Sequence, residues 1–193
     1  MKVLFCCVLL LVGCARKDTT NLEKPEPAIK KLLARTDVVL IKHFYGEQAV
    51  FEDKTTTDEI PGHVSVQAVW VYQPQQEKSG QKGCLIEVAE GFIFSEYATQ
   101  TKGSSFLDLD ELKDLQSALA YLNQPDSPWR HPTSSEYVET SFVSKDSFSA
   151  SAFHGHDGDS LAVYSEQAKV FLPISKLPEL QKAVDSAIHS LGD

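Results

Sequence analysis

The sequence predicts an α+β fold built from two tandem units, each with four strands followed by one helix. Short runs rich in β-branched and aromatic residues recur over residues 63–109 and again over residues 136–174. Each series ends in a segment whose apolar residues are three and four apart, the spacing of an amphipathic helix. The segment between them, residues 124–135, is rich in Pro and Ser and is typical of a linker.

The elements that precede the first unit are expected to be a short helix and a strand or hairpin. Residues 28–34 fit a short helix, and residues 37–45 fit a strand around an apolar Val-Val-Leu-Ile segment. Gly46-Glu47 is expected to turn the chain into a second strand over residues 49–52. The polar residues 54–62 then form a loop.

The two units are expected within a single α+β domain over residues 36–193, at about residues 63–123 and 136–191. The first has strands over residues 63–73, 84–90, 92–99 and 105–109 and a helix over residues 110–123, and the second has strands over residues 136–145, 148–155, 160–166 and 169–174 and a helix over residues 175–191. The acidic residues around Asp108 and Asp110 are expected to cap the first helix, because carboxylates are favourable at a helix N-terminus.

The two helices and the residues before them are similar enough to indicate an internal repeat. Phe106-Leu107 has its counterpart in Phe171-Leu172, sixty-five residues later. Any two amphipathic helices share a leucine spacing, but that spacing requires neither the Phe-Leu pair nor the shared glutamines. The matching helix positions are Leu112, Leu115, Gln116, Ala118 and Leu119 in the first and Leu177, Leu180, Gln181, Ala183 and Val184 in the second. We therefore infer a duplication.

This order of elements over residues 63–191 resembles the Whirly and PUR-type fold of single-stranded nucleic-acid-binding proteins. The resemblance implies two curved four-stranded sheets that pack through their helices into one pseudo-symmetric domain. It implies the architecture and not the activity, because that family uses basic sheets with stacking aromatic residues and this chain is acidic.

The N-terminal residues resemble the lipobox-type signal peptide of bacterial lipoproteins. Lys2 is followed by ten apolar residues, and Leu11-Val12-Gly13 stands directly before Cys14. The resemblance implies removal of residues 1–13 and attachment of diacylglycerol and palmitate-type acyl chains to Cys14, which holds the protein on the membrane. A plain secretory signal peptide is the alternative, and ten apolar residues are too few for a transmembrane helix.

The residues after Cys14 are expected to act as a lipidated tether over residues 14–35, with Pro25 and Pro27 opposing a long helix. In Gram-negative lipoproteins an Asp after the acylated cysteine favours inner-membrane retention. Ala15 stands at that position, so the resemblance implies an outer-membrane lipoprotein.

Composition argues against a nucleic-acid-binding protein. The formal net charge is −9, and it becomes −10 when residues 1–13 are removed. Nucleic-acid binding needs clustered Lys and Arg, so no nucleic-acid partner is expected. Cys84 is the one cysteine left after processing and acylation, which leaves no intramolecular disulfide, and its apolar neighbours indicate a buried, inert thiol.

The densest group of potential metal ligands lies in a predicted hairpin. The sequence His154-Gly155-His156-Asp157-Gly158-Asp159 offers two imidazoles and two carboxylates that could bind zinc or another divalent metal. Asp157-Gly158 between two strand-like runs is equally a signal for a two-residue turn, in which these side chains are simply exposed. The turn is the preferred interpretation, and no cofactor is expected.

Two aromatic segments remain as possible contact surfaces. Trp129 and Arg130 in the linker could form an interaction site for a partner, or Trp129 could instead close the core between the units. Trp70 and Tyr72 alternate with Val69 and Val71, so this strand is either buried on both faces or carries an exposed aromatic row.

The nucleophile motif Gly-x-Ser-x-Gly, the zinc motif His-Glu-x-x-His and the phosphate-binding glycine loop do not occur in the sequence. The expected function is therefore a non-catalytic binding or interaction module at the cell envelope, attached through its N-terminal lipid and with an envelope protein as a possible partner. The alternative is a periplasmic metal-binding factor that uses His154, His156, Asp157 and Asp159.

Overall fold

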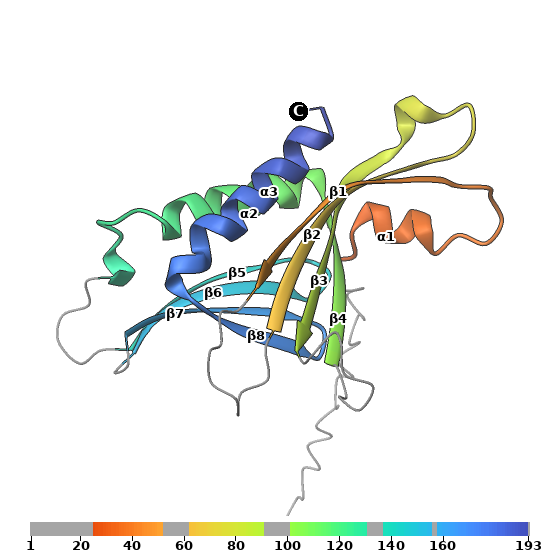
Figure 1. Ribbon diagram of the computed structural model, residues 1–193. Coiled ribbons are helices and arrows are strands. Elements are labelled where there is room, and N and C mark those ends of the chain that lie inside the picture. Colours follow the sequence, from red (N-terminus) through yellow and green to blue (C-terminus); the bar gives the residue numbers. More distant parts are fainter. Residues whose placement is uncertain (1–24, 52–61, 91–100, 131–136, 156–157, 193) are drawn as a thin grey trace, which may run out of the picture.

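The structure is a computed structural model that describes residues 25–51, 62–90, 101–130, 137–155 and 158–192. It has two four-stranded antiparallel sheets, each followed by a helix, which confirms the predicted fold class (Figure 1). Sheet A contains β1 (Ile41–Phe51), β2 (Gly62–Tyr72), β3 (Gln81–Glu90) and β4 (Thr101–Asp108); sheet B contains β5 (Val138–Val143), β6 (Phe148–Gly155), β7 (Gly158–Ser165) and β8 (Ala168–Pro173). The helices are α1 (Ala28–Leu33), α2 (Leu109–Leu122) and α3 (Leu177–Ser190), and the 3-10 turns are η1 (Glu77–Ser79), η2 (Pro128–Arg130) and η3 (Ile174–Lys176).

Two details predicted for the N-terminal part of the domain are wrong. The Gly46-Glu47 segment does not separate two strands, because β1 runs through it as one strand with a register shift between Tyr45 and Gln48. Gly46 has φ of 43°, a conformation that glycine adopts without strain, and this allows the bulge. Since β1 pairs with β2, the first unit begins at Ile41 and not near residue 63. The strand expected over residues 92–99 lies outside the described residues.

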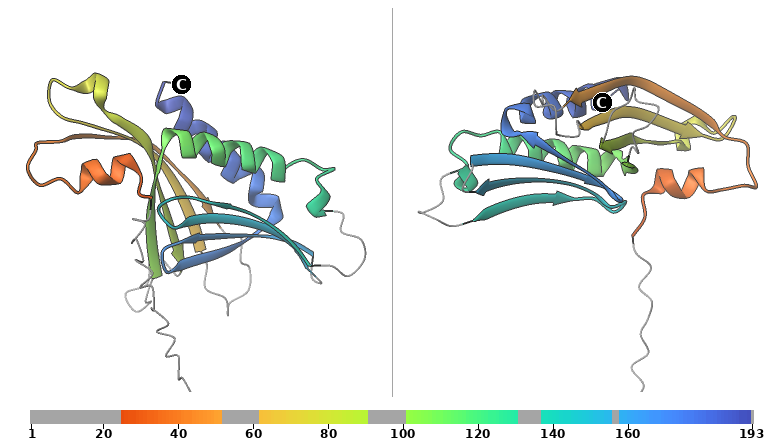
Figure 2. Two further views of the ribbon diagram at one scale, coloured as in Figure 1. Left: turned by 180° about the vertical axis from the view of Figure 1, so that it is seen from behind. Right: turned by 60° about the horizontal axis from the view of Figure 1, so that its bottom comes forward.

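The two sheets converge at one side, and α2 and α3 lie in the angle between them (Figures 1 and 2). One face of each sheet supplies its apolar side chains to the same core as both helices, with Val66 and Leu161 completely buried there. Helix α3 follows sheet B in the sequence but packs on β1 and β2 of sheet A. Each unit therefore depends on the other to bury its apolar surface.

The residues that indicated a repeat occupy equivalent places around the helix pair. The matched leucines Leu112, Leu115, Leu177 and Leu180 are all fully buried. The shared glutamines both lie at the contact between the helices. Gln116 Nε2 donates to Asp185 Oδ1 at 2.7 Å, and Asn123 Nδ2 donates to Gln181 Oε1 at 3.1 Å. These polar bonds fix the register of α2 against α3.

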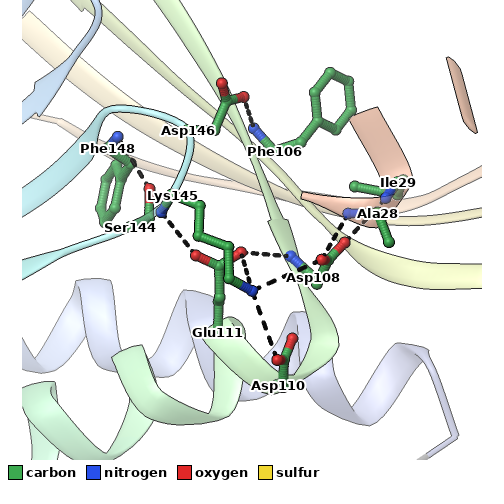
Figure 3. A network of polar contacts seen from close by, with 10 residues as sticks. All are labelled: Ala28, Ile29, Phe106, Asp108, Asp110, Glu111, Ser144, Lys145, Asp146 and Phe148. Carbon is green, nitrogen blue, oxygen red and sulfur yellow. Dashed lines mark hydrogen bonds and ion pairs between the residues drawn. The ribbon is translucent and has the colours of Figure 1, made fainter. Parts of the chain in front are cut away.

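Asp108 joins α1 to the end of sheet A (Figure 3). Its carboxylate accepts hydrogen bonds from the first two amides of α1, those of Ala28 at 2.7 Å and Ile29 at 3.0 Å. Asp108 is also the N-cap residue of α2 and forms a capping box with Glu111. One carboxylate at the predicted cap thus serves two helices, and α1 covers Val69 and Val71 on the outer face of sheet A.

The turn between β5 and β6 is attached to the same junction. Glu111, 6% exposed, accepts a hydrogen bond from the Lys145 amide at 2.8 Å, and Asp146 accepts one from the Phe106 amide at 2.9 Å (Figure 3). Asp146 also pairs with Lys30 of α1. The Ser105 hydroxyl donates to the Asp146 carbonyl at 2.7 Å. Sheet B is therefore bonded to both α1 and sheet A at this corner.

The two sheets touch backbone to backbone at Gly103 of β4. A Cβ atom at this position would lie 1.8 Å from the carbonyl oxygen of Ser165, at the end of β7, and 3.3 Å from the Ala168 side chain. The neighbouring Ser105 and Ser165 hydroxyls share a buried hydrogen bond of 2.7 Å. Glycine is required here for close approach and not for an unusual φ, because Gly103 is not among the residues with positive φ.

We expect Gly103→Ala to destabilise the protein by about 3 kcal/mol, because the added methyl group forces the two sheets apart. A loss of that size lowers the melting temperature by roughly 6–12 °C in a domain of this length, which thermal unfolding followed by circular dichroism measures. Ser104→Ala, at the adjacent exposed position of the same strand, is the matched control and should change stability by less than about 0.5 kcal/mol. Equal melting temperatures for the two variants would contradict the close contact.

Candidate functional site

The predicted histidine hairpin forms, with β6 and β7 paired as far as Gly155 and Gly158. His156 and Asp157, which link the two strands in the sequence, lie outside the described residues. His154 and Asp159 face each other across the hairpin, and Nδ1 of His154 is 2.7 Å from Oδ1 of Asp159. The second oxygen of Asp159 is 3.9 Å from Nη1 of Arg130. Both described members of the predicted metal set therefore already have partners within the fold.

Among the described residues there is no group of three His, Cys, Asp or Glu side chains arranged to hold a metal ion. The predicted set of four ligands includes two residues beyond that part of the chain, so the metal site stays a prediction. A hydrogen bond between a carboxylate and an imidazole is also how proteins orient a metal-binding histidine, and His154 and Asp159 have this arrangement.

Trp129 lies in the core and not on the surface. It is 1% exposed, and the guanidinium of Arg130 stacks on its ring at 4.7 Å. Arg130 Nη2 donates to the Leu122 carbonyl at 3.2 Å, which ties η2 to the end of α2. The expectation that Trp129 closes the core is confirmed, and its burial argues against its use as an exposed interaction residue. Arg130 is half-buried.

Cys84 is the buried, inert thiol that the sequence predicts. Its side chain is fully buried on β3, and desolvation raises the pKa of the thiol well above its usual range. A thiol that stays protonated is neither a nucleophile nor a metal ligand at neutral pH.

A cavity of about 520 Å³ at the corner shown in Figure 3 is lined by the charged residues Glu26, Lys30, Lys31, Lys145 and Asp146. Two of its lysines are held by carboxylates of the fold. Lys30 pairs with Asp146, and Lys145 Nζ is 3.5 Å from Glu111, 3.7 Å from Asp110 and 4.0 Å from Asp108. Burial opposes the charge on Lys145, but these carboxylates outweigh it and raise the pKa of Lys145. We interpret this corner as a structural clamp.

The strongest candidate for a binding site is a group of aromatic rings at the end of sheet A that bears the η1 loop. His43 and Tyr45 of β1 and Trp70 and Tyr72 of β2 point to the same face of the sheet as the core. The His43 ring centroid is 6.0 Å from that of Tyr45, 5.7 Å from that of Trp70 and 5.6 Å from that of Tyr72. The Trp70 and Tyr72 centroids are 4.6 Å apart. We call these four residues the aromatic cluster.

Tyr45 and Trp70 of the aromatic cluster remain partly accessible because the helix over them is shorter than the strands beneath it, whereas Tyr72 is buried. β1 and β2 each have 11 residues, and an 11-residue strand extends for about 36 Å. The 14 residues of α3 extend for about 21 Å. The helix ends at Ser190, next to Gly46 in the β1 bulge, so Tyr45 and Trp70 are half-buried instead of sealed in the core.

Contacts between the rings and their neighbours hold the cluster in place. Nε2 of His43 and the hydroxyl of Tyr72 share a hydrogen bond of 3.0 Å, and desolvation raises the pKa of Tyr72, which keeps this hydroxyl protonated. Gly80, just after η1, lies so close to the edge of Trp70 that a Cβ atom there would be 2.5 Å from its indole nitrogen. These contacts fix the ring positions before any ligand arrives.

Lys82 of β3 closes one side of the cluster. It lies opposite Trp70 in the register of the sheet, with its ammonium 6.0 Å from the indole centroid. The same ammonium donates to the carbonyl of Leu191 at 2.5 Å, which satisfies one of the free carbonyls at the end of α3. Lys82 thereby joins the third strand of sheet A to the last turn of the protein.

Together these elements form a cleft of about 580 Å³. Its lining residues are Tyr45, Trp70, Glu77, Lys78, Gly80, Lys82, Ser190, Leu191 and Gly192. A volume of this size, with aromatic walls and a few polar groups, is typical of small-ligand sites. We call it the aromatic cleft.

The sequence pointed to part of this site only. Both alternatives for the strand with Trp70 are partly correct, since Val69 and Val71 are buried under α1 and Trp70 faces the cleft. His43, Tyr45 and Lys82 were not predicted as site residues. The apolar and aromatic alternation around His43 was the available signal, but only the strand register shows that it adjoins Trp70.

No family model, curated protein or solved structure matches this chain. Within the described residues, no helix is both long enough and apolar enough to cross a membrane.

We expect zinc to leave the melting temperature of the purified protein unchanged, because Asp159 is held between His154 and Arg130 and is not free to act as one of the four predicted ligands. The measurement is thermal unfolding with and without zinc. A ligand at about 100 times its dissociation constant adds about 2.7 kcal/mol of stability, so a real site gives a clear upward shift.

A zinc-dependent rise that disappears in the double variant His154→Ala, His156→Ala would contradict this expectation. The rise should persist in His189→Ala, an exposed histidine on α3 that serves as the control. Such a result would establish the hairpin as a metal site.

Proposed function

We propose that this protein is a lipid-anchored lipoprotein of the bacterial cell envelope that acts as a non-catalytic binding module through its aromatic cleft. The observation that carries the binding role is the position of Tyr45 and Trp70, half-buried in a cleft of about 580 Å³ at the uncovered end of sheet A. Rings fixed by neighbours and accessible to solvent contribute to ligand binding at little cost in conformational entropy.

The proposed anchor rests on the lipobox-like residues that end at Cys14, and Ala15 after them favours the outer membrane. Ten residues separate Cys14 from Pro25, where the described chain begins. At 3.3–3.6 Å per residue, this segment lets the domain stand at most about 40 Å from its anchor. The protein would thus reach partners or ligands near the membrane surface.

A second candidate function, a periplasmic metal-binding factor, has one observation in its favour. This is the hydrogen bond between His154 and Asp159, which would orient the imidazole toward a metal if His156 and Asp157 completed the site. The zinc measurement described above separates it from the binding module.

The anchor is tested by Cys14→Ser. We expect the variant to accumulate as an uncleaved precursor or to leave the membrane fraction, because serine cannot carry the thioether-linked lipid. Membrane fractionation and intact mass measure both outcomes. The control is Cys84→Ser, which keeps the lipobox and should be processed and anchored normally if it folds. Normal processing and anchoring of Cys14→Ser would overturn the lipoprotein proposal.

The binding role is tested by co-purification from gently solubilised envelopes, with bound molecules identified by mass. We expect a stoichiometric component with the wild type that is reduced about tenfold or more with Trp70→Leu, which removes the largest ring of the cleft. The matched control is Phe171→Leu, which removes a 45%-exposed aromatic ring from sheet B. Equal recovery with Trp70→Leu and Phe171→Leu would show that the partner does not use the cleft.

A further inference from the structure

We infer that the aromatic cleft binds a neutral saccharide, by packing the C–H face of a sugar ring on Tyr45 and Trp70 and bonding its hydroxyl groups to the polar rim. This inference rests on the proposed binding function and adds the chemical class of the ligand. It follows from the composition, charge and shape of the cleft.

The rings supply an apolar, electron-rich wall. Tyr45 and Trp70 line the cleft, and His43 and Tyr72 lie beside them on the same face of the sheet, at centroid distances between 4.6 and 6.0 Å. Planes of His43 and Tyr45 differ by 9°, and those of His43 and Tyr72 by 11°, so these rings are nearly parallel. Aromatic faces carry partial negative charge and attract the slightly positive hydrogens of C–H groups.

The rim of the cleft is polar and offers both donors and acceptors. Glu77 accepts hydrogen bonds, Lys78 donates them, and the Ser190 hydroxyl does both. An entirely apolar ligand would remove these groups from water without bonding to them, which is unfavourable. The cleft therefore suits a ligand with one apolar face and many hydroxyl groups, which is the chemistry of a sugar ring.

The charges around the cleft favour a neutral ligand. The cleft is lined by one carboxylate, Glu77, and by the ammonium of the next residue, Lys78, and both residues are exposed. The second ammonium, that of Lys82, is already directed to the Leu191 carbonyl at the negative end of α3. The lining thus mixes charges of both signs, with no block of like charge to select a strongly charged ligand. The volume of about 580 Å³ admits a short oligosaccharide.

Tryptophan fluorescence gives a direct test, because the chain has two tryptophans and only Trp70 lies in the cleft. Trp129 is 1% exposed in the core, so a ligand in the cleft leaves its emission unchanged. The full-length protein, in a detergent without a sugar headgroup, is titrated with the neutral tetrasaccharides cellotetraose and N-acetylchitotetraose. Indole, a flat aromatic compound without hydroxyl groups, is the comparison ligand, because it can pack on the rings but cannot bond to the rim through hydroxyls.

We expect at least one tetrasaccharide to give a saturable change in emission that is retained up to about 0.5 M NaCl, because binding of a neutral ligand is not screened by salt. Isothermal titration calorimetry should show affinity weaker by about tenfold or more in Tyr45→Ala and in Trp70→Leu. Phe171→Leu should bind within about twofold of the wild type. Tyr45→Ala retains Trp70 as the reporter and covers the case in which Trp70→Leu does not fold.

Failure of both tetrasaccharides to bind the wild type would overturn the saccharide inference, as would binding of indole alone or equal affinities in all variants. Failure of the proposed binding function gives a different result from failure of the saccharide inference. If saccharides do not bind but a co-purifying component still depends on Trp70, the cleft binds another class of molecule and the binding module stands. If neither result is obtained, both proposals fall.

Discussion

The packing of α3 on the sheet of the other unit is the constraint on which the rest of the structure depends. Sheet A cannot bury Val64, Val66 and Ala68 without a helix that the chain supplies more than a hundred residues later. The helix pair is held in register by Gln116 and Gln181, each bonded to the opposite helix. Because the units share one core, we expect them to fold as a single cooperative domain.

The same arrangement produces the aromatic cleft. Helix α3 crosses from the second unit onto sheet A, and its 14 residues are too short to cover the full length of β1 and β2. Lys82 satisfies the last carbonyl of that helix and Gly46 lets the first strand bulge beside it, so the end of α3 is fixed relative to the rings. The cleft thus results from the difference in length between α3 and the strands. Its edges are set by the bond that Lys82 makes at the end of α3 and by the bulge at Gly46.

Most of the architecture could be predicted from local patterns. The leucine spacing placed α2 and α3 within two residues of their bounds, and alternation located all four strands of sheet B. The error at Gly46-Glu47 arose because a glycine with positive φ serves a bulge as readily as a turn, and only pairing with β2 distinguishes them. The sequence predicted only part of the aromatic cleft, the possible aromatic row at Trp70. Tyr45 was missed because it is 25 residues away and is brought near Trp70 only by the register of β1 and β2. For Trp129 the sequence left two roles open, an exposed interaction residue or a core residue, and only its 1% exposure in the structure decides for the core.

The attachment of α1 has a mechanical consequence under the proposed anchoring of the chain at Cys14. A force applied through residues 15–24 reaches α1 first. It is resisted by the hydrogen bonds from two backbone amides to the Asp108 carboxylate and by the ion pair between Lys30 and Asp146. These contacts lie at the corner where sheet A meets the start of α2 and the β5–β6 turn, and α1 itself packs on the outer face of sheet A, opposite the main core. Under force, the contacts of α1 would break before sheet A unfolds. Residues 25–40 would then extend and lengthen the linker to the anchor, while both sheets and their helices stayed folded.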